Sequence, residues 1–231
     1  MDWNTVVGDF CETKLLGHPE IYNSLSCVFI SLFPYLGLKY SYLKSNIIKS
    51  ILTLLFINGF ASFGFHWTGY YFFKHLDEVP MIICIWLGLL YGSSYLELSL
   101  VNYFLLNLYF TLILAMNNIP KLSFLFPVTF GIACLLLIPL QKKFFEMKPI
   151  NKLSKRLMIT GSFISIFSAI IWIVTENMCC HELLFGHPLW HFAMPLGMYF
   201  IMIGFEYHNI KITENKARIT WLYNLLPIIN L

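Results

Sequence analysis

The stretch LMITGSFISIFSAIIWIV, residues Leu157–Val174, carries no charged side chain and decides the class of fold. A transmembrane helix needs about 20 predominantly apolar residues to cross the hydrocarbon core of a bilayer. Over the whole chain, 58% of residues are hydrophobic and only 12% are charged, whereas a soluble domain usually has about 25% charged residues. The composition therefore predicts an integral membrane protein.

Six further apolar runs have similar length, which gives seven candidate spans. They are Ser24–Leu38, Ile48–Phe65, Val79–Leu96, Val101–Met116, Ser123–Leu140, Leu157–Val174 and Pro188–Phe205. Only the region of Glu97 separates the third run from the fourth, so one merged helix is the main alternative, although it would overrun the bilayer. We predict an all-α bundle of seven transmembrane helices, forming a single membrane domain over residues 1–231.

The lysine and arginine residues predict how this bundle is inserted, because cytoplasmic loops carry an excess of both. Twelve of the fifteen lie in the loops after the first and fifth spans and in the C-terminal segment. This bias places an N-terminal segment, residues 1–22, outside the cytosol and a tail, residues 206–231, inside it. The net charge of +3 is small and scattered, so we expect no nucleic-acid partner.

Five polar residues are predicted to lie together at the outer membrane face. His187 and His191 are four residues apart at the start of the seventh span, which puts both imidazoles on one helix face. His66 ends the second span, Ser62 precedes it by four residues, and Asp77 precedes the third span. Three histidines with one open position are a common catalytic zinc set, and zinc lowers the pKa of bound water to about 7. The aspartate can accept a proton from that water, and the serine can stabilise an oxyanion.

Each of these residues also has a purely structural interpretation. The histidine pair could form hydrogen bonds between helices, Ser62 could be a small packing residue, and Asp77 could cap a helix. Their joint placement at one depth favours a functional site, because polar groups inside a membrane are costly. The other four histidines are expected to have no role in the site; they are His18, His75, His181 and His208.

Three stretches resemble the alkaline ceramidases, and more widely the superfamily that includes adiponectin receptors and GPI-remodelling lipid hydrolases. They are Phe65-His66-Trp67-Thr68, Leu76-Asp77-Glu78 and Gly186-His187-Pro188-Leu189-Trp190-His191. The resemblance implies that the three histidines bind zinc, that Asp77 positions and deprotonates water, and that Ser62 stabilises the oxyanion. The implied reaction is hydrolysis of the amide bond of ceramide, within the membrane, to a sphingoid base and a free fatty acid.

The segment Asp9-Phe10-Cys11-Glu12, with Glu20 further on, resembles the calcium-binding segment of the ceramidases. Carboxylate oxygens suit calcium, and Phe10 stands where the family has a tryptophan that would bind through its carbonyl oxygen. Lys14, however, occupies the place of an expected asparagine ligand, which puts Ca²⁺ in doubt. We hypothesise that the Lys14 ammonium replaces the ion and neutralises the three carboxylates. A solvated acidic cluster without an ion is the alternative.

The same resemblance implies a disulfide across the outer face. We predict that Cys11 pairs with Cys180, with Cys179 as the rival partner. Disulfides are permitted outside the cytosol.

Three other functions remain open beside ceramide hydrolysis. They are a zinc esterase acting on phospholipids or GPI lipids, a heptahelical receptor with structural zinc, and a metal transporter. The acidic N-terminal segment favours the ceramidase, and about 22 residues before the first span are few for a receptor. The expected location is a bacterial inner membrane or an ER or Golgi membrane, with the site on the extracytoplasmic face. The expected partner is membrane ceramide, and no protein partner is predicted.

Overall fold

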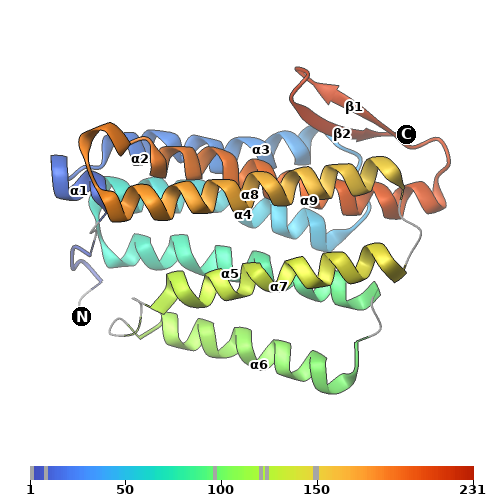
Figure 1. Ribbon diagram of the computed structural model, residues 1–231, viewed down its shortest axis with the longest axis horizontal. Coiled ribbons are helices and arrows are strands. Elements are labelled where there is room, and N and C mark those ends of the chain that lie inside the picture. Colours follow the sequence, from blue (N-terminus) through green and yellow to red (C-terminus); the bar gives the residue numbers. More distant parts are fainter. Residues whose placement is uncertain (1–2, 8–9, 96–97, 120–121, 123–124, 148–150) are drawn as a thin grey trace.

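Long helices make up most of the chain in the computed structural model, which describes residues 3–7, 10–95, 98–119, 122, 125–147 and 151–231 (Figure 1). The helices are α1 (Cys11–Leu16), α2 (Ile21–Ser26), α3 (Val28–Tyr40), α4 (Asn46–Thr68), α5 (Tyr71–Tyr95), α6 (Leu100–Asn117), α7 (Phe126–Met147), α8 (Lys152–Met178), the 3-10 helix η2 (His181–Leu183) and α9 (Gly186–Thr213). Two strands follow, β1 (Arg218–Leu222) and β2 (Leu226–Asn230).

Seven segments in the described part of the chain are long and apolar enough to cross a membrane. They are Ile21–Tyr40, Asn46–Thr68, Tyr71–Ser94, Leu100–Asn117, Phe126–Glu146, Lys152–Met178 and His181–Thr213. Each overlaps one predicted span, so the predicted class of helical membrane protein is confirmed. The alternative of one merged third and fourth helix is wrong, because α6 begins separately at Leu100. The Ser99 hydroxyl caps it by accepting a hydrogen bond from the Asn102 N–H at 3.2 Å.

Helix α9 is the most buried of the seven candidate spans. In its most apolar window 56% of residues are buried, against 17% for α6 and 11% for α7. It packs along α8 and contacts α3 and α4, while α5 lies between α4 and α7. In Figure 1 the long helices run side by side, with α6 at one edge. The residues that α9 carries are therefore the ones most shielded from lipid.

Two glycines allow α8 and α9 to pack closely. A Cβ atom on Gly197 would lie 2.6 Å from the carbonyl oxygen of Gly161, and one on Gly161 would lie 2.9 Å from the backbone nitrogen of Ile201. Small residues allow such close contact between transmembrane helices. Because α8 leads into the loop before α9, this packing fixes where the first turn of α9 begins.

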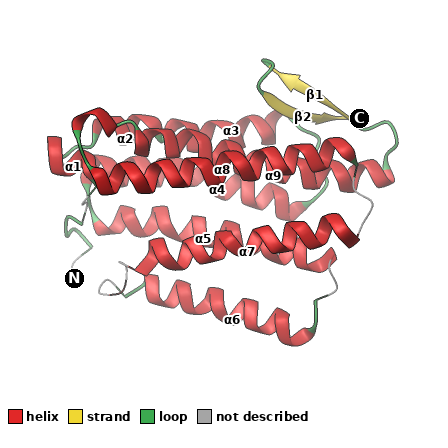
Figure 2. Cartoon of the chain, viewed as in Figure 1, coloured by secondary structure: helices red, strands yellow, loops and turns green. Residues whose placement is uncertain are grey.

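The C-terminal residues differ from the tail expected at 206–231. Helix α9 continues to Thr213, and the strands β1 and β2 then form an antiparallel hairpin (Figure 2). The Tyr199 hydroxyl donates to the carbonyl of Pro227 at 2.8 Å, and the Tyr42 N–H donates to that of Ile229 at 2.8 Å. These contacts dock the hairpin on α9 and on the loop after α3.

The N-terminal segment is fixed at the opposite end of the bundle. The Val7 N–H donates to the Gly69 carbonyl at 2.8 Å, and the Tyr71 N–H donates to the Thr5 carbonyl at 2.9 Å. Helices α1 and α2 lie at this same end, beside the start of α9 (Figure 1). The N-terminal segment therefore lies beside the ends of α4 and α9 that carry the predicted histidines.

Candidate metal centre and active site

The three predicted histidines meet in the folded chain. His66 lies in the last turn of α4, and His187 and His191 lie in the first turns of α9. The centroid of the His66 ring is 4.8 Å from that of His187 and 4.9 Å from that of His191, and the two rings on α9 are 4.6 Å apart. All three side chains are buried. Buried polar groups so close together need partners or an ion.

Two of these histidines have a carboxylate at the same ring nitrogen. His66 Nδ1 lies 2.5 Å from Glu20 Oε2, and His187 Nδ1 lies 3.1 Å from Glu176 Oε1. A histidine that binds a metal usually donates its other ring N–H to a carboxylate or a carbonyl, which fixes the tautomer. With Nδ1 protonated, both rings keep the Nε2 lone pair available for an ion.

The third histidine is held by oxygen atoms of another kind. His191 Nδ1 lies 2.8 Å from the hydroxyl of Ser26 and 3.2 Å from the carbonyl oxygen of Asn23. The three rings therefore share one arrangement, with Nδ1 engaged and Nε2 left for coordination. This shared arrangement fits a zinc ion, for which neutral imidazole is a preferred ligand.

A buried thiol lies beside the histidines. Cys27, His66 and His191 form a candidate metal-binding group whose donor atoms lie within 4.8 Å of one another. However, the Cys27 thiol donates to the Asn23 carbonyl at 3.1 Å and faces His191 at Nδ1, 3.7 Å away. That nitrogen is the one already held by oxygen atoms, so the thiol is on the wrong side of the His191 ring to share an ion bound at Nε2. The structure thus offers two candidate third ligands, Cys27 and His187.

Ser62 and Asp77 face the same space as the histidines. Both line a cavity of about 750 Å³ together with His66, His187 and His191. Ser62 is buried on α4, and Asp77 is half-buried near the start of α5. The Asn58 amide donates to Asp77 Oδ1 at 2.6 Å, which fixes one carboxylate oxygen. The five residues that the sequence grouped by depth thus line one cavity.

The cavity continues from the histidines into the bundle between α5, α7, α8 and α9. Its walls are mostly apolar, as expected for a pocket that binds a lipid. Several wall residues on α7 and α8 also have exposed side chains; they are Leu135, Ile138, Ile166, Ile170 and Ile173. The cavity therefore reaches the outer surface of the bundle between these two helices.

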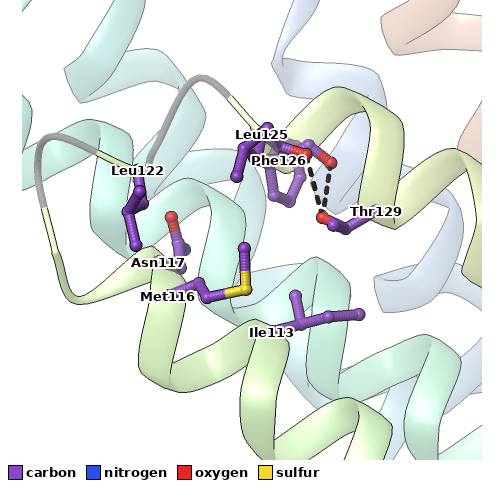
Figure 3. Close-up of a pocket in the computed structure, with 7 residues that line it drawn as sticks. All are labelled: Ile113, Met116, Asn117, Leu122, Leu125, Phe126 and Thr129. Carbon is purple, nitrogen blue, oxygen red and sulfur yellow. Dashed lines mark hydrogen bonds between the residues drawn. The ribbon is translucent and has the colours of Figure 1, made fainter.

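A second, much smaller cavity lies between α6 and the start of α7 (Figure 3). Its volume is about 10 Å³, which is room for about one water molecule. Thr129 at its edge donates to the carbonyls of Leu125 and Phe126, and no histidine lines it. This cavity is too small for a substrate.

The acidic residues of the N-terminal segment have other partners than those expected. Glu12 accepts hydrogen bonds from the N–H groups of Tyr22 and Asn23 at 2.8 and 2.9 Å, so it caps the start of α2. Glu20 accepts from Thr13 and from the Asn23 amide, besides contacting His66. Both glutamates are buried, so the alternative of a solvated acidic cluster is wrong for them.

The charge of Glu20 is stabilised despite its burial. Burial acts to raise the pKa of this carboxyl, but the hydrogen bond from His66, with the bonds from Asn23 and Thr13, outweighs it and lowers the pKa. Glu20 is therefore a carboxylate at neutral pH. The hypothesis that Lys14 replaces calcium stays a prediction, because Asp9 lies outside the described residues.

The predicted disulfide partner was wrong by one residue. The disulfide joins Cys11 to Cys179, with a Cα–Cα distance of 5.2 Å, and Cys180 is a free thiol. Cys179 ends α8 in the left-handed conformation, with φ of 34°, whereas Cys180 is extended, with φ of −140°, and leads into η2. The left-handed turn at Cys179 lets its side chain meet α1.

Phe10 and Glu176 contribute to the site in ways that the sequence analysis missed. The Phe10 ring packs on His187 with centroids 4.5 Å apart, so its side chain covers the histidines. Glu176 accepts from the Cys11 N–H at 2.7 Å while its other oxygen contacts His187. The only signal for Glu176 in the sequence was its position three and four residues before the adjacent Cys179 and Cys180.

Comparisons with known proteins identify the family of the chain. A search of curated proteins found no match. The family model described as Ceramidase matches residues 4–230. Since that match covers nearly the whole chain, including every residue of the site, the protein belongs to the ceramidase family.

Proposed function

We propose that the protein hydrolyses the amide bond of ceramide and that His66, His187 and His191 hold the zinc ion it needs. One observation carries the proposal. Three buried imidazoles, each with Nδ1 engaged by oxygen, lie at the head of an apolar cavity large enough for a lipid chain. A bound zinc ion would polarise the substrate carbonyl and lower the pKa of water to about 7.

Asp77 and Ser62 take the two remaining roles. Asp77 lines the cavity, and Asn58 holds one of its carboxylate oxygens, so it is positioned to accept a proton from water and to return it to the leaving amine. Ser62 lines the same cavity, and its hydroxyl can donate a hydrogen bond to the oxyanion that forms from the amide carbonyl.

The cavity supports a substrate that stays in the membrane. Its exposed apolar wall between α7 and α8 lets a lipid chain move in sideways from the bilayer, without passing through water. Its low polarity strengthens electrostatic interactions at the histidine end. A lipid whose amide lies at the histidines and whose acyl chain fills the cavity suits this shape.

The charge distribution supports a site on the extracytoplasmic face. The histidines lie at the end of the bundle with few lysine and arginine residues, and cytoplasmic ends are enriched in both. We propose that the N-terminus lies outside the cytosol and the C-terminal hairpin inside it, in a bacterial inner membrane or an ER or Golgi membrane.

Product analysis by mass spectrometry tests the proposal. Purified protein is incubated with ceramides and phospholipids, beside the variants His191→Ala, Asp77→Asn and His181→Ala, the last an exposed histidine outside the cavity. We expect sphingoid base from the native protein and from His181→Ala. We expect none from His191→Ala, and a loss of about 10²–10⁴ in rate with zinc retained for Asp77→Asn.

Two outcomes would reject ceramide hydrolysis. Lysophospholipid without sphingoid base would indicate an ester hydrolase with the same metal site. Stoichiometric zinc without any product would indicate a structural metal in a receptor-like protein.

A further inference from the structure

The end of the cavity far from the histidines is polar. Gln141 on α7 and Ser162 on α8 both line it, and the Ser162 hydroxyl donates to Gln141 Oε1 at 2.9 Å. On α9, Phe205 lines the cavity fourteen residues beyond His191, and it packs on Phe144, which lies one helical turn after Gln141 on α7. At about 1.5 Å per residue, fourteen residues of helix span about 21 Å. The hydrogen-bonded pair is therefore far from the residues that carry the reaction.

Gln141 keeps one hydrogen-bonding group unpaired. Its side-chain nitrogen Nε2 is buried and has no hydrogen-bond partner among the residues that the structure describes. A buried amide N–H without a hydrogen-bond partner is unfavourable. The apolar end of an acyl chain cannot accept a hydrogen bond, so contact with it would leave the N–H unpaired. The pair thus presents a surface that a methyl group avoids.

A closed apolar cluster lies one helical turn beyond Gln141 and Ser162, on the side away from the histidines. Phe144 and Met158 are almost fully buried, and the Phe144 ring packs on Phe205 with centroids 4.8 Å apart. Phe205 itself lines the deep end of the cavity. A chain that reaches Gln141 therefore cannot continue along the bundle.

We propose that Gln141 and Ser162 form the floor of an acyl-chain site and set the longest acyl chain that the enzyme accepts. The inference rests on the proposed function, since it assumes that the substrate amide lies at the histidines. The depth of about 21 Å along α9, from His191 to Phe205, exceeds the roughly 15 Å of one bilayer leaflet, half of the hydrocarbon core. Long acyl chains therefore fill the site, medium chains leave part of it empty, and still longer chains meet the floor.

A different role for the pair would be mechanical. The Ser162–Gln141 hydrogen bond joins α7 to α8, and it could serve only to hold these helices together. In that case a change at either residue would lower stability and would leave the preference for chain length unaltered.

Chain-length profiles of two opposite variants separate these roles. The native protein, Gln141→Ala and Ser162→Leu each receive ceramides with one sphingoid base and acyl chains that increase in steps of two carbons. Leu136→Ala is the control, since this α7 residue is exposed and does not line the cavity. Gln141→Ala removes part of the floor, so the longest acyl chain that is hydrolysed should become longer. Ser162→Leu places a larger side chain in the deep end of the cavity, so the longest acyl chain that is hydrolysed should become shorter.

The expected change is about tenfold in the ratio of rates for the two chain lengths on either side of the native limit. The Leu136→Ala control should keep the native profile. Profiles that stay the same in both floor variants would overturn the proposal.

Photo-crosslinking tests the floor without requiring turnover. Ceramides with a diazirine at the last carbon of a long or a medium acyl chain are irradiated with the native protein, and the attached peptides are sequenced. The long chain should attach beside Gln141 and Ser162, and the medium chain nearer Phe130. Attachment at the floor without release of sphingoid base would support the floor and reject hydrolysis. Release of base with attachment elsewhere would reject the floor alone.

Discussion

The carboxylates that contact the Nδ1 atoms of the histidines support a metal-binding role as much as the histidines do. Glu20 is fully buried, and its oxygen lies 2.5 Å from His66 Nδ1. A charged acceptor at this nitrogen orients the ring and raises the basicity of the ligand nitrogen. We therefore propose that Glu20 supports the candidate metal centre, although its sequence context is that of a calcium ligand.

We predict that Glu20→Gln weakens zinc binding about 10- to 100-fold, since the ring loses a charged partner. The measurement is competition for zinc with a chelator of known affinity. Glu146→Gln is the control, because Glu146 is an exposed member of an ion pair with Lys142 on α7. Equal zinc affinity in both variants would contradict the role given to Glu20.

The choice between His187 and Cys27 as the third ligand gives a second prediction. His187→Ala should lose stoichiometric zinc because it removes a ligand, whereas Cys27→Ser should retain it because the thiol faces the Nδ1 side of His191. Metal analysis of both purified variants checks this. Zinc lost from Cys27→Ser and kept in His187→Ala would reverse the assignment.

Residue spacing predicted which side chains line the histidine end of the cavity, but not the residues that hold them in place. His187 and His191 are one helical turn apart, and His66 ends an apolar run, so topology alone brings them to one depth. Glu20 and its partner His66 are 46 residues apart in the chain, and no periodic pattern relates them. The choice of Cys179 over Cys180 depends on a single left-handed residue, which sequence propensities do not reveal.

At the scale of elements, hydropathy located the helices but not their ends. Helix α5 begins at Tyr71, eight residues before the predicted start at Val79. The early turns carry the ion pair between Lys74 and Glu78 at 3.7 Å, one turn apart, which supports a helix but interrupts an apolar run. The C-terminal hairpin was missed because its strands are short and follow the last apolar window.

The close contact between α8 and α9 gives a prediction at this scale. Gly161→Ala should destabilise the bundle by about 1–3 kcal/mol, because the new Cβ atom meets backbone atoms of α9 that cannot yield. Gly131→Ala is the matched control, since a Cβ atom there meets nothing within 4 Å, and alanine favours a helix over glycine. Unfolding in lipid or detergent measures both.

Helices α8 and α9 would not need their close packing if Gly161→Ala were as stable as Gly131→Ala. The destabilised variant is also expected to lose activity, because the same contact positions the start of α9.

For the whole molecule, the distribution of lysine and arginine residues predicts one orientation in the membrane, with the histidines on the extracytoplasmic side. A tag fused to the C-terminus should bind antibody only after the membrane is permeabilised, and a tag before Met1 should bind without permeabilisation, because loops rich in lysine and arginine usually face the cytosol. The opposite pattern would place the histidines on the cytosolic side and contradict the proposed location.

The central claim is that this bundle is a zinc-dependent amidase acting on a lipid within the membrane. The most direct test is to remove zinc from the native protein with a chelator, restore it, and follow release of sphingoid base from ceramide at each stage. We predict that release stops on zinc removal and returns when zinc alone is added. Release that continues unchanged without zinc, or no release from the zinc-loaded protein, would contradict the claim.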